Sequence, residues 1–92
     1  MYAVVVNVSI AAGQFETTRK AVYDQVVPRA KQAHGFLKGY WTVSADSREG
    51  TSMTIFQTKQ DAESALAMIR TSTPPAGISF NSTDVREVIA EA

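Results

Sequence analysis

The sequence predicts a single α+β domain over residues 1–92, in which strands and helices follow one another in the order βαββαβ. β-branched residues dominate Tyr2–Ile10, as expected of a strand that is buried on both faces. Two later stretches, 14–26 and 60–71, carry apolar side chains at helical spacing. With 45% hydrophobic and 20% charged residues, the composition is that of a folded globular protein.

The first helix is expected to be interrupted by a proline. Pro28 cannot sit in the interior of a helix, because its ring would clash with the carbonyl of Asp24. The stretch 14–26 is therefore followed by a predicted kink or restart. A second helical piece over 29–34 then ends at Gly35, a typical left-handed C-cap.

Residues 36–58 are expected to form a β-hairpin. The stretches 36–45 and 51–58 contain aromatic and β-branched residues that favour strands. Between them, the polar stretch 46–50 has the length and the glycine of a hairpin connection. The two strands are therefore predicted to pair in an antiparallel manner.

A second helix and a last strand complete the order. Thr58 followed by Asp61 resembles a capping box, with Asp where Glu is usual, and predicts the start of the helix over 60–71. The proline-rich loop 73–77 ends this helix, and the apolar residues of 78–90 predict the final strand. This is the order of a ferredoxin-like fold, with a four-stranded antiparallel sheet and two helices on one face.

The sheet is predicted to be apolar on both faces, although two helices can cover only one of them. Both faces of the first strand carry apolar side chains: Val4, Val6 and Val8 on one, Ala3 and Val5 on the other. Simple alternation also divides the large residues of the second strand: Leu37, Trp41 and Val43 on one face, Phe36 and Tyr40 on the other. Because an exposed apolar face favours association, we expect a homodimer formed through the sheet.

Composition and charge exclude several classes of function. The formal net charge is 0, with nine Lys and Arg against nine Asp and Glu, so we expect no nucleic-acid partner. The absence of cysteine excludes disulfides, thiolate nucleophiles and cysteine-ligated metals. The longest apolar run, Met1–Val6, is too short to span a bilayer, and no basic residue precedes it as in a secretion signal. We therefore expect a cytoplasmic protein with no membrane partner.

Three stretches of the chain are similar to motifs of a known family. His34-Gly35-Phe36 resembles a Pro-Gly-Phe turn into the second strand, with His in place of Pro. Gly39-Tyr40-Trp41 lies in that strand, and 55–62 resembles a passage from an aromatic residue through Ser or Thr to an acidic helix start. The chain thereby resembles the dimeric α+β barrel superfamily, in particular its antibiotic-biosynthesis-monooxygenase-like branch. The resemblance implies a homodimer with two sheets packed face to face.

The resemblance also implies a cavity between sheet and helices for a small apolar, aromatic or polyketide-like molecule. Some members oxidise such a molecule without a cofactor, because an electron-rich phenolate or enolate can itself reduce dioxygen once its proton is removed. We therefore expect no cofactor, and either a cofactor-free monooxygenase or a non-catalytic relative that binds a small organic molecule. The alternative is a structural or interaction module whose side chains leave no cavity.

A related branch of the family degrades haem and provides a contrast. It has an Asn on the first strand, as this chain has at Asn7. It also has a Trp where Phe56 stands and a haem-ligating His on the second helix, which has none here. Haem degradation is therefore not expected.

Five residues are candidates for a site. Asn7 is polar in a strand expected to be buried, so its amide would bond either a ligand or a neighbouring backbone group. His34 is the candidate proton acceptor, although a polar residue at a helix end also suits the helix dipole. Tyr23, Trp41 and Phe56 are candidates to line a ligand cavity, and packing or surface roles would equally explain the first two. A single histidine with scattered carboxylates predicts no metal site.

Overall fold

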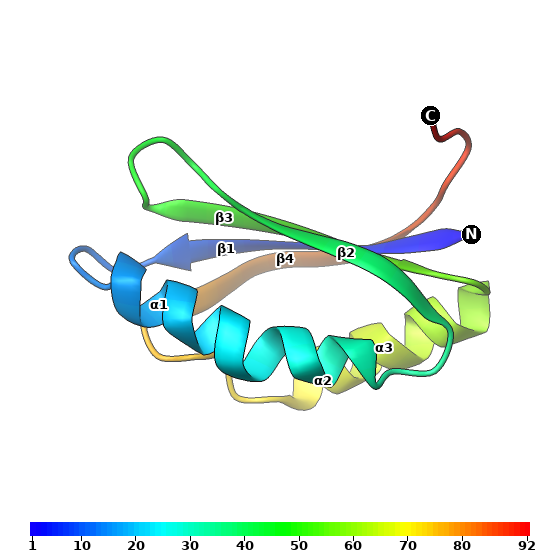
Figure 1. Ribbon diagram of the computed structural model, residues 1–92, viewed down its shortest axis with the longest axis horizontal. Coiled ribbons are helices and arrows are strands. Elements are labelled where there is room, and N and C mark those ends of the chain that lie inside the picture. The colour runs from blue at the N-terminus through cyan, green and yellow to red at the C-terminus, as the bar shows by residue number, and fades with distance from the viewer.

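Four strands form one antiparallel sheet in the order β2-β3-β1-β4, and the helices lie on one side of it (Figure 1). The computed structural model describes residues 1–92. Its elements are β1 (Tyr2–Ile10), α1 (Phe15–Ala21), η1 (Val22–Val26), α2 (Val27–Lys31), β2 (Phe36–Val43), β3 (Glu49–Phe56), α3 (Lys59–Thr71) and β4 (Ile78–Glu87). The predicted ferredoxin-like order is confirmed. None of the helices is long and apolar enough to cross a lipid bilayer.

The core lies between the sheet and α3. It is formed by the buried side chains of Val4, Val6, Phe56, Ala62 and Leu66. The start of α3 is fixed as predicted, because the Asp61 N–H donates to the Thr58 hydroxyl over 3.1 Å. α3 packs on β1, β3 and β4, whereas α2 contacts β2.

The first helix passes Pro28 by means of a π-helical turn. α1, η1 and α2 follow one another directly, and within η1 the Val27 N–H donates to the Val22 carbonyl, five residues back. Pro28 then lies in the first turn of α2, where its missing N–H costs no hydrogen bond. In place of the predicted kink or restart, the helix continues through a π-helical turn, and it ends at Lys31 instead of His34. Gly35, with φ +77°, belongs to the turn into β2 and is not the helix cap.

The predicted division of β2 into two faces is wrong at Phe36, because the strand contains a β-bulge at Leu37. Phe36 pairs with Phe56 and Lys38 with Ile55, so one residue of β2 has no partner. Phe36 therefore faces the helices, where its ring meets that of Phe56 edge-on at 6.0 Å between centroids. Simple alternation placed Phe36 on the opposite face because it cannot detect an inserted residue.

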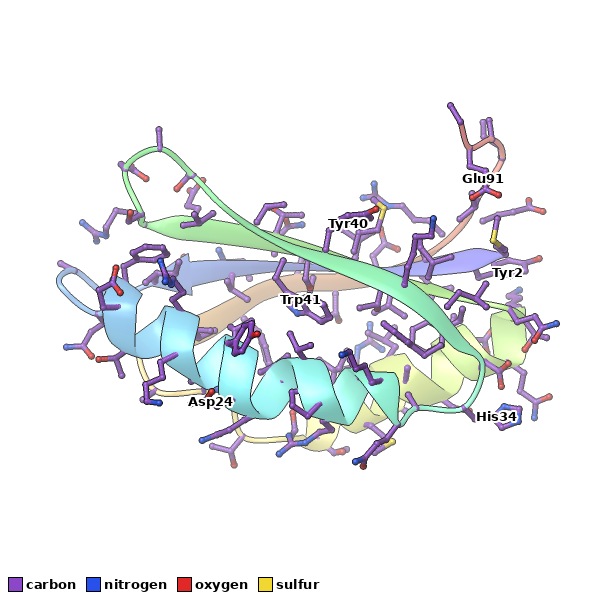
Figure 2. All side chains as sticks on the ribbon, viewed as in Figure 1. Tyr2, Asp24, His34, Tyr40, Trp41 and Glu91 are labelled. Atoms are coloured by element: carbon purple, nitrogen blue, oxygen red, sulfur yellow. The ribbon has the colours of Figure 1, made fainter.

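The side of the sheet turned away from the helices is called the open face below. Tyr40 and Trp41 lie on opposite sides of β2, as predicted, with Tyr40 on the open face and Trp41 toward the first helix (Figure 2). On this face Tyr40 is 63% and Met53 is 41% exposed, whereas Ala3 and Val5 of the central strand β1 are buried.

Candidate functional site

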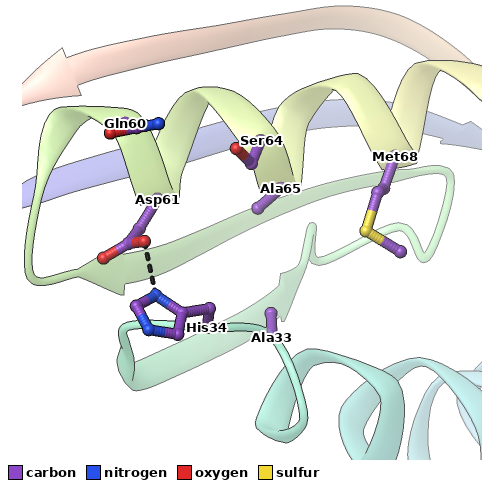
Figure 3. A pocket seen from close by; sticks show the side chains of 7 residues that line it. All are labelled: Ala33, His34, Gln60, Asp61, Ser64, Ala65 and Met68. Carbon is purple, nitrogen blue, oxygen red and sulfur yellow. Dashed lines mark hydrogen bonds and ion pairs between the residues drawn. The ribbon is translucent and has the colours of Figure 1, made fainter.

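An imidazole and a carboxylate are hydrogen-bonded between the turn after α2 and the start of α3, and they become an ion pair when the imidazole is protonated. His34 Nδ1 lies 2.7 Å from Asp61 Oδ1 (Figure 3). The Asp61 side chain is only 13% exposed, whereas that of His34 is 93% exposed. Because the carboxylate accepts a hydrogen bond at Nδ1, a neutral imidazole carries its proton there and leaves Nε2 free to accept another. The pair therefore has the arrangement of an oriented general base.

Local backbone geometry holds this pair together. Gly35 lies directly against the Asp61 carboxylate, and a Cβ at Gly35 would be 2.5 Å from Asp61 Cγ. The Gln57 N–H donates to the Gly35 carbonyl over 2.9 Å. Asp61 itself is fixed by the Thr58 cap at the start of α3. The turn that carries His34 is thus tied to the start of α3 by backbone and side-chain contacts.

The hydrogen bond with His34, followed by one with Thr58, lowers the pKa of Asp61 below its ordinary value of 3.8. A carboxyl whose pKa is lower in the folded state stabilises the fold at pH values above the unfolded pKa. This stabilisation is lost as the pH falls through the folded value. The contribution of Asp61 is therefore complete at neutral pH and disappears in acid.

The Asp61→Asn variant is expected to be less stable than the parent protein at neutral pH and to approach it below about pH 4. Urea unfolding of both proteins between neutral pH and pH 3 measures this difference. The Ser44 hydroxyl and the Arg48 amide also lower the pKa of Asp46. Asp46 is present in both proteins, so its contribution to stability cancels in the comparison. A stability difference that does not change with pH would contradict the assignment.

The ion pair lies at one end of a groove of about 380 Å³ between the turn after α2 and α3. The groove is lined by Ala33, His34, Gln60, Asp61, Ser64, Ala65 and Met68. Met68, which is 63% exposed, lies at the end away from the ion pair (Figure 3). The groove therefore offers apolar surface along its length and a proton acceptor at one end.

Asn7 lies on the open face, and both the oxygen and the nitrogen of its side-chain amide form hydrogen bonds. The Thr51 hydroxyl donates to Asn7 Oδ1 over 2.7 Å, and Asn7 Nδ2 donates to the Ser82 hydroxyl over 2.9 Å. The bonds join three adjacent strands, β3, β1 and β4. The amide thus has side-chain partners within the sheet, where sequence reasoning expected a ligand or a backbone group.

Trp41 lies on the other side of the sheet, between β2 and the first helix (Figure 2). Its ring extends over Gly39, where a Cβ would be only 2.9 Å from Cη2 of the indole. The absence of a side chain at Gly39 gives the ring this space. Trp41 is half-buried, so part of its surface remains available to a molecule between helix and sheet.

The other predicted residues are not brought to one place. Tyr23 is 78% exposed, and Phe56 is buried in the core at 2% exposure. A second groove of about 260 Å³, lined by Thr17, Lys20, Ala21, Asp24, Gln25 and Ala76, contains none of the five candidates. No group of three or more His, Asp and Glu side chains is placed to hold a metal ion.

Of the five candidates, only His34 lines the larger groove. Sequence reasoning recognised Asp61 only as a helix-capping residue and did not single out Gln60, Ser64 or Met68. The four residues lie along one helix that the sequence predicts to be amphipathic, which is the signal that could have grouped them. Their meeting with His34, which is 27 residues before Asp61, depends on tertiary structure.

No protein-family model matches the chain, and no curated protein matches its sequence. Solved structures do share its fold. A provisionally assigned monooxygenase of Shewanella loihica PV-4 superposes with a TM-score of 0.67 and 16% identity, covering 98% of this chain and 96% of that one. The monooxygenase from the gene ActVA-Orf6 of Streptomyces coelicolor, in complex with nanaomycin D, has a TM-score of 0.58 and 13% identity, covering 99% and 92%. The predicted ferredoxin-like α+β fold is thus shared with two solved proteins that are described as monooxygenases.

Proposed function

We propose that the protein is a cofactor-independent monooxygenase that acts on a small aromatic or polyketide-like compound. The observation that carries this proposal is the similarity in fold, over nearly the whole of each chain, to two proteins described as monooxygenases. One of these is solved in complex with the ligand nanaomycin D, which supports a small organic molecule as the ligand of this chain. The oriented imidazole of His34 supplies the proton acceptor that such chemistry needs.

The reaction can proceed with dioxygen as the only oxidant. A phenol conjugated to a methylene group loses a proton to Nε2 of His34, and the resulting anion is rich enough in electrons to reduce dioxygen. A carbon–oxygen bond then forms to give a hydroperoxide, which loses water and becomes a carbonyl. One oxygen atom enters the product and the other leaves as water, so the methylene carbon supplies all four electrons.

Asp61 acts through His34 in this scheme and is a positioning residue. Its carboxylate selects the tautomer in which Nε2 is free and stabilises the imidazolium after proton transfer. The groove along α3 provides apolar surface beside this acceptor. Trp41 does not line this groove. It is half-buried between the first helix and the sheet, where its ring offers a separate aromatic surface for a substrate ring.

Oxygen consumption with a panel of hydroquinones and phenols that carry a conjugated methylene group, together with incorporation of labelled oxygen into the product, tests the proposal. The parent protein is expected to consume dioxygen with at least one compound, and His34→Gln is expected to lower kcat about 10²- to 10⁴-fold. Asp24→Asn is the control, because Asp24 pairs with Lys20 outside the His34 groove. If no compound in the panel causes oxygen uptake, the proposal of a monooxygenase fails.

A second candidate function is a non-catalytic module that binds a small molecule or serves a structural role. It is favoured by the Asn7 amide, whose two groups already have partners, and by Phe56, which is packed in the core. Because Trp41 is the only tryptophan, its fluorescence reports binding near the first helix. A fluorescence change on addition of a compound that is never oxidised would favour this second function.

The proposal includes a homodimer formed through the open face. Tyr40 and Met53 are neighbours on this face and both remain exposed. An exposed apolar patch on a sheet is stabilised when a second copy covers it.

Met53→Glu is expected to shift the protein to the monomer, because it would place a carboxylate inside the interface. Met68→Glu is the matched control, since Met68 is also an exposed methionine but lies on α3, on the opposite side of the sheet. Sedimentation equilibrium at micromolar concentration measures both variants. A parent protein that sediments as a monomer would exclude the dimer.

A further inference from the structure

The floor of the groove beside His34 is formed by two alanines. Ala33 lies in the turn after α2 and Ala65 lies on α3, and their methyl groups are turned toward each other across the groove (Figure 3). Both residues are half-buried and pack against the core of the domain. A molecule lying in the groove would therefore have apolar atoms beneath it.

The groove is a gap between two helices that hardly touch. α2 packs on η1 and β2, and α3 packs on β1, β3 and β4, but α2 and α3 make at most marginal contact with each other. Helices that pack directly lie about 8–10 Å apart and interlock their side chains. Here alanine stands at the facing positions, and its methyl group is too short to fill the space between them. The absence of a longer side chain thus leaves this space to a ligand.

Backbone hydrogen bonds fix the two sides of the groove. The Ala33 N–H donates to the Ala30 carbonyl over 3.1 Å, and the Phe36 N–H donates to the Ala33 carbonyl over 3.2 Å. On the other side, the Thr58 hydroxyl caps the start of the helix that carries Ala65. Because the groove is already formed, little conformational freedom is lost when a molecule enters it.

The polar groups of the groove lie at one end and on the side of α3. Nε2 of His34 is free to accept a hydrogen bond at the end, and the exposed Gln60 and Ser64 line the α3 side. The volume of about 380 Å³ is near the lower limit of the roughly 300–1,000 Å³ typical of ligand pockets. These features together suit a small aromatic molecule with a hydroxyl at one end.

We propose that Ala33 and Ala65 determine the substrate specificity of the groove, because their methyl groups leave room for a flat molecule of one or two fused rings. The hydroxyl of this molecule donates to Nε2 of His34, and its rings lie over the two methyl groups toward Met68. The inference rests on the proposed function, to which it adds the size and the orientation of the substrate.

Binding of 2-naphthol tests the inference without turnover, because this compound lacks the methylene group that the proposed reaction oxidises. In ¹H–¹⁵N NMR spectra, the amide signals of Ala33, Ser64 and Ala65 are expected to shift. 2-Methoxynaphthalene, which has no hydroxyl proton, is expected to bind about three- to tenfold more weakly. Equal binding of the two compounds would overturn the orientation. Shifts confined to Trp41 and the first helix would place the ligand between helix and sheet and overturn the whole inference.

Ala33→Leu and Ala65→Leu are each expected to raise the Kd of 2-naphthol about fivefold or more, because leucine fills the space of the rings. Ala67→Leu is the matched control, since it makes the same change on α3 at an exposed position that does not line the groove. The two leucine variants lie on separate elements, and thermal unfolding of each shows whether it remains folded.

A smaller ligand shows whether the alanines select by size. The Kd of 4-methylphenol should rise less than that of 2-naphthol in both leucine variants, because a single ring reaches less far along the groove from His34. Equal losses for the two compounds, or no loss in either variant, would overturn the assignment of Ala33 and Ala65.

Oxygen uptake separates this inference from the function on which it rests. If the parent protein binds 2-naphthol in the groove but oxidises no compound of the panel, the monooxygenase fails and the size selection stands. If the protein consumes oxygen and neither Ala33→Leu nor Ala65→Leu changes the KM, the monooxygenase stands and the groove is not its substrate site.

Discussion

Replacing Gly35 with alanine is expected to destabilise the fold by about 2–5 kcal/mol. The positive φ of +77° costs a non-glycine residue roughly 1–2 kcal/mol, and the overpacked contact costs about 1–3 kcal/mol more. The added Cβ would displace the Asp61 carboxylate and with it the hydrogen bond to His34. For a domain of this size the melting temperature should fall by about 8–40 °C, as measured by thermal unfolding.

Gly13 provides a matched control for this prediction. Its φ is +75°, but no atom lies within 4 Å of a Cβ built there. Gly13→Ala should therefore show the conformational cost alone, and the difference between the two variants measures the contact with Asp61. The double variant Gly35→Ala/Asp61→Ala should recover part of the loss. Equal destabilisation by the two glycine substitutions would argue against the contact.

Phe56→Ala is expected to destabilise the protein by about 3–5 kcal/mol, which is a large part of the 5–15 kcal/mol typical of a domain. Phe56 is 2% exposed and meets Phe36 edge-on, so its removal leaves a cavity in the core beneath α3. Urea unfolding with a fixed m-value measures the change.

Tyr23→Ala serves as the control for Phe56→Ala, because Tyr23 is 78% exposed and should change stability by less than about 0.5 kcal/mol. A small effect of Phe56→Ala would place this residue outside the core. The role in lining a ligand cavity for which Phe56 is a candidate in the sequence predicts a different result. In that case Phe56→Leu would weaken ligand binding with little change in stability.

Much of the fold could be predicted because local patterns determine it. The β-branched run of β1, the Thr58 cap and the helical spacing of α3 each depend on neighbouring residues, and each appears where expected. The bulge at Leu37 could not be foreseen, because alternation assumes one partner for every residue. The π-helical turn before Pro28 could not be foreseen either, because the sequence predicts a kink or restart at the proline. The helical piece expected over 29–34 ends at Lys31.

The candidate site was less accessible to sequence reasoning. His34 is a candidate proton acceptor because histidine as a residue type exchanges protons near neutral pH, a property that can be read from the sequence alone. Its carboxylate partner is set by the turn at Gly35 and by the start of α3, two features that only the folded chain brings together. The sequence predicts that Asn7 and Trp41 each line a ligand cavity, yet pleating places them on opposite sides of the sheet.

The π-helical turn lets one helix continue past a proline. Such a turn contains one residue more than an α-helical turn, and the Val27 N–H donates to the Val22 carbonyl, five residues back. Deleting one residue within Val22–Val26 would restore α-helical spacing and bring the Pro28 ring against the carbonyl four residues before it, as in the interior of an ordinary helix. One surplus residue upstream of Pro28 thus allows the chain to reach the turn before β2 without breaking the helix.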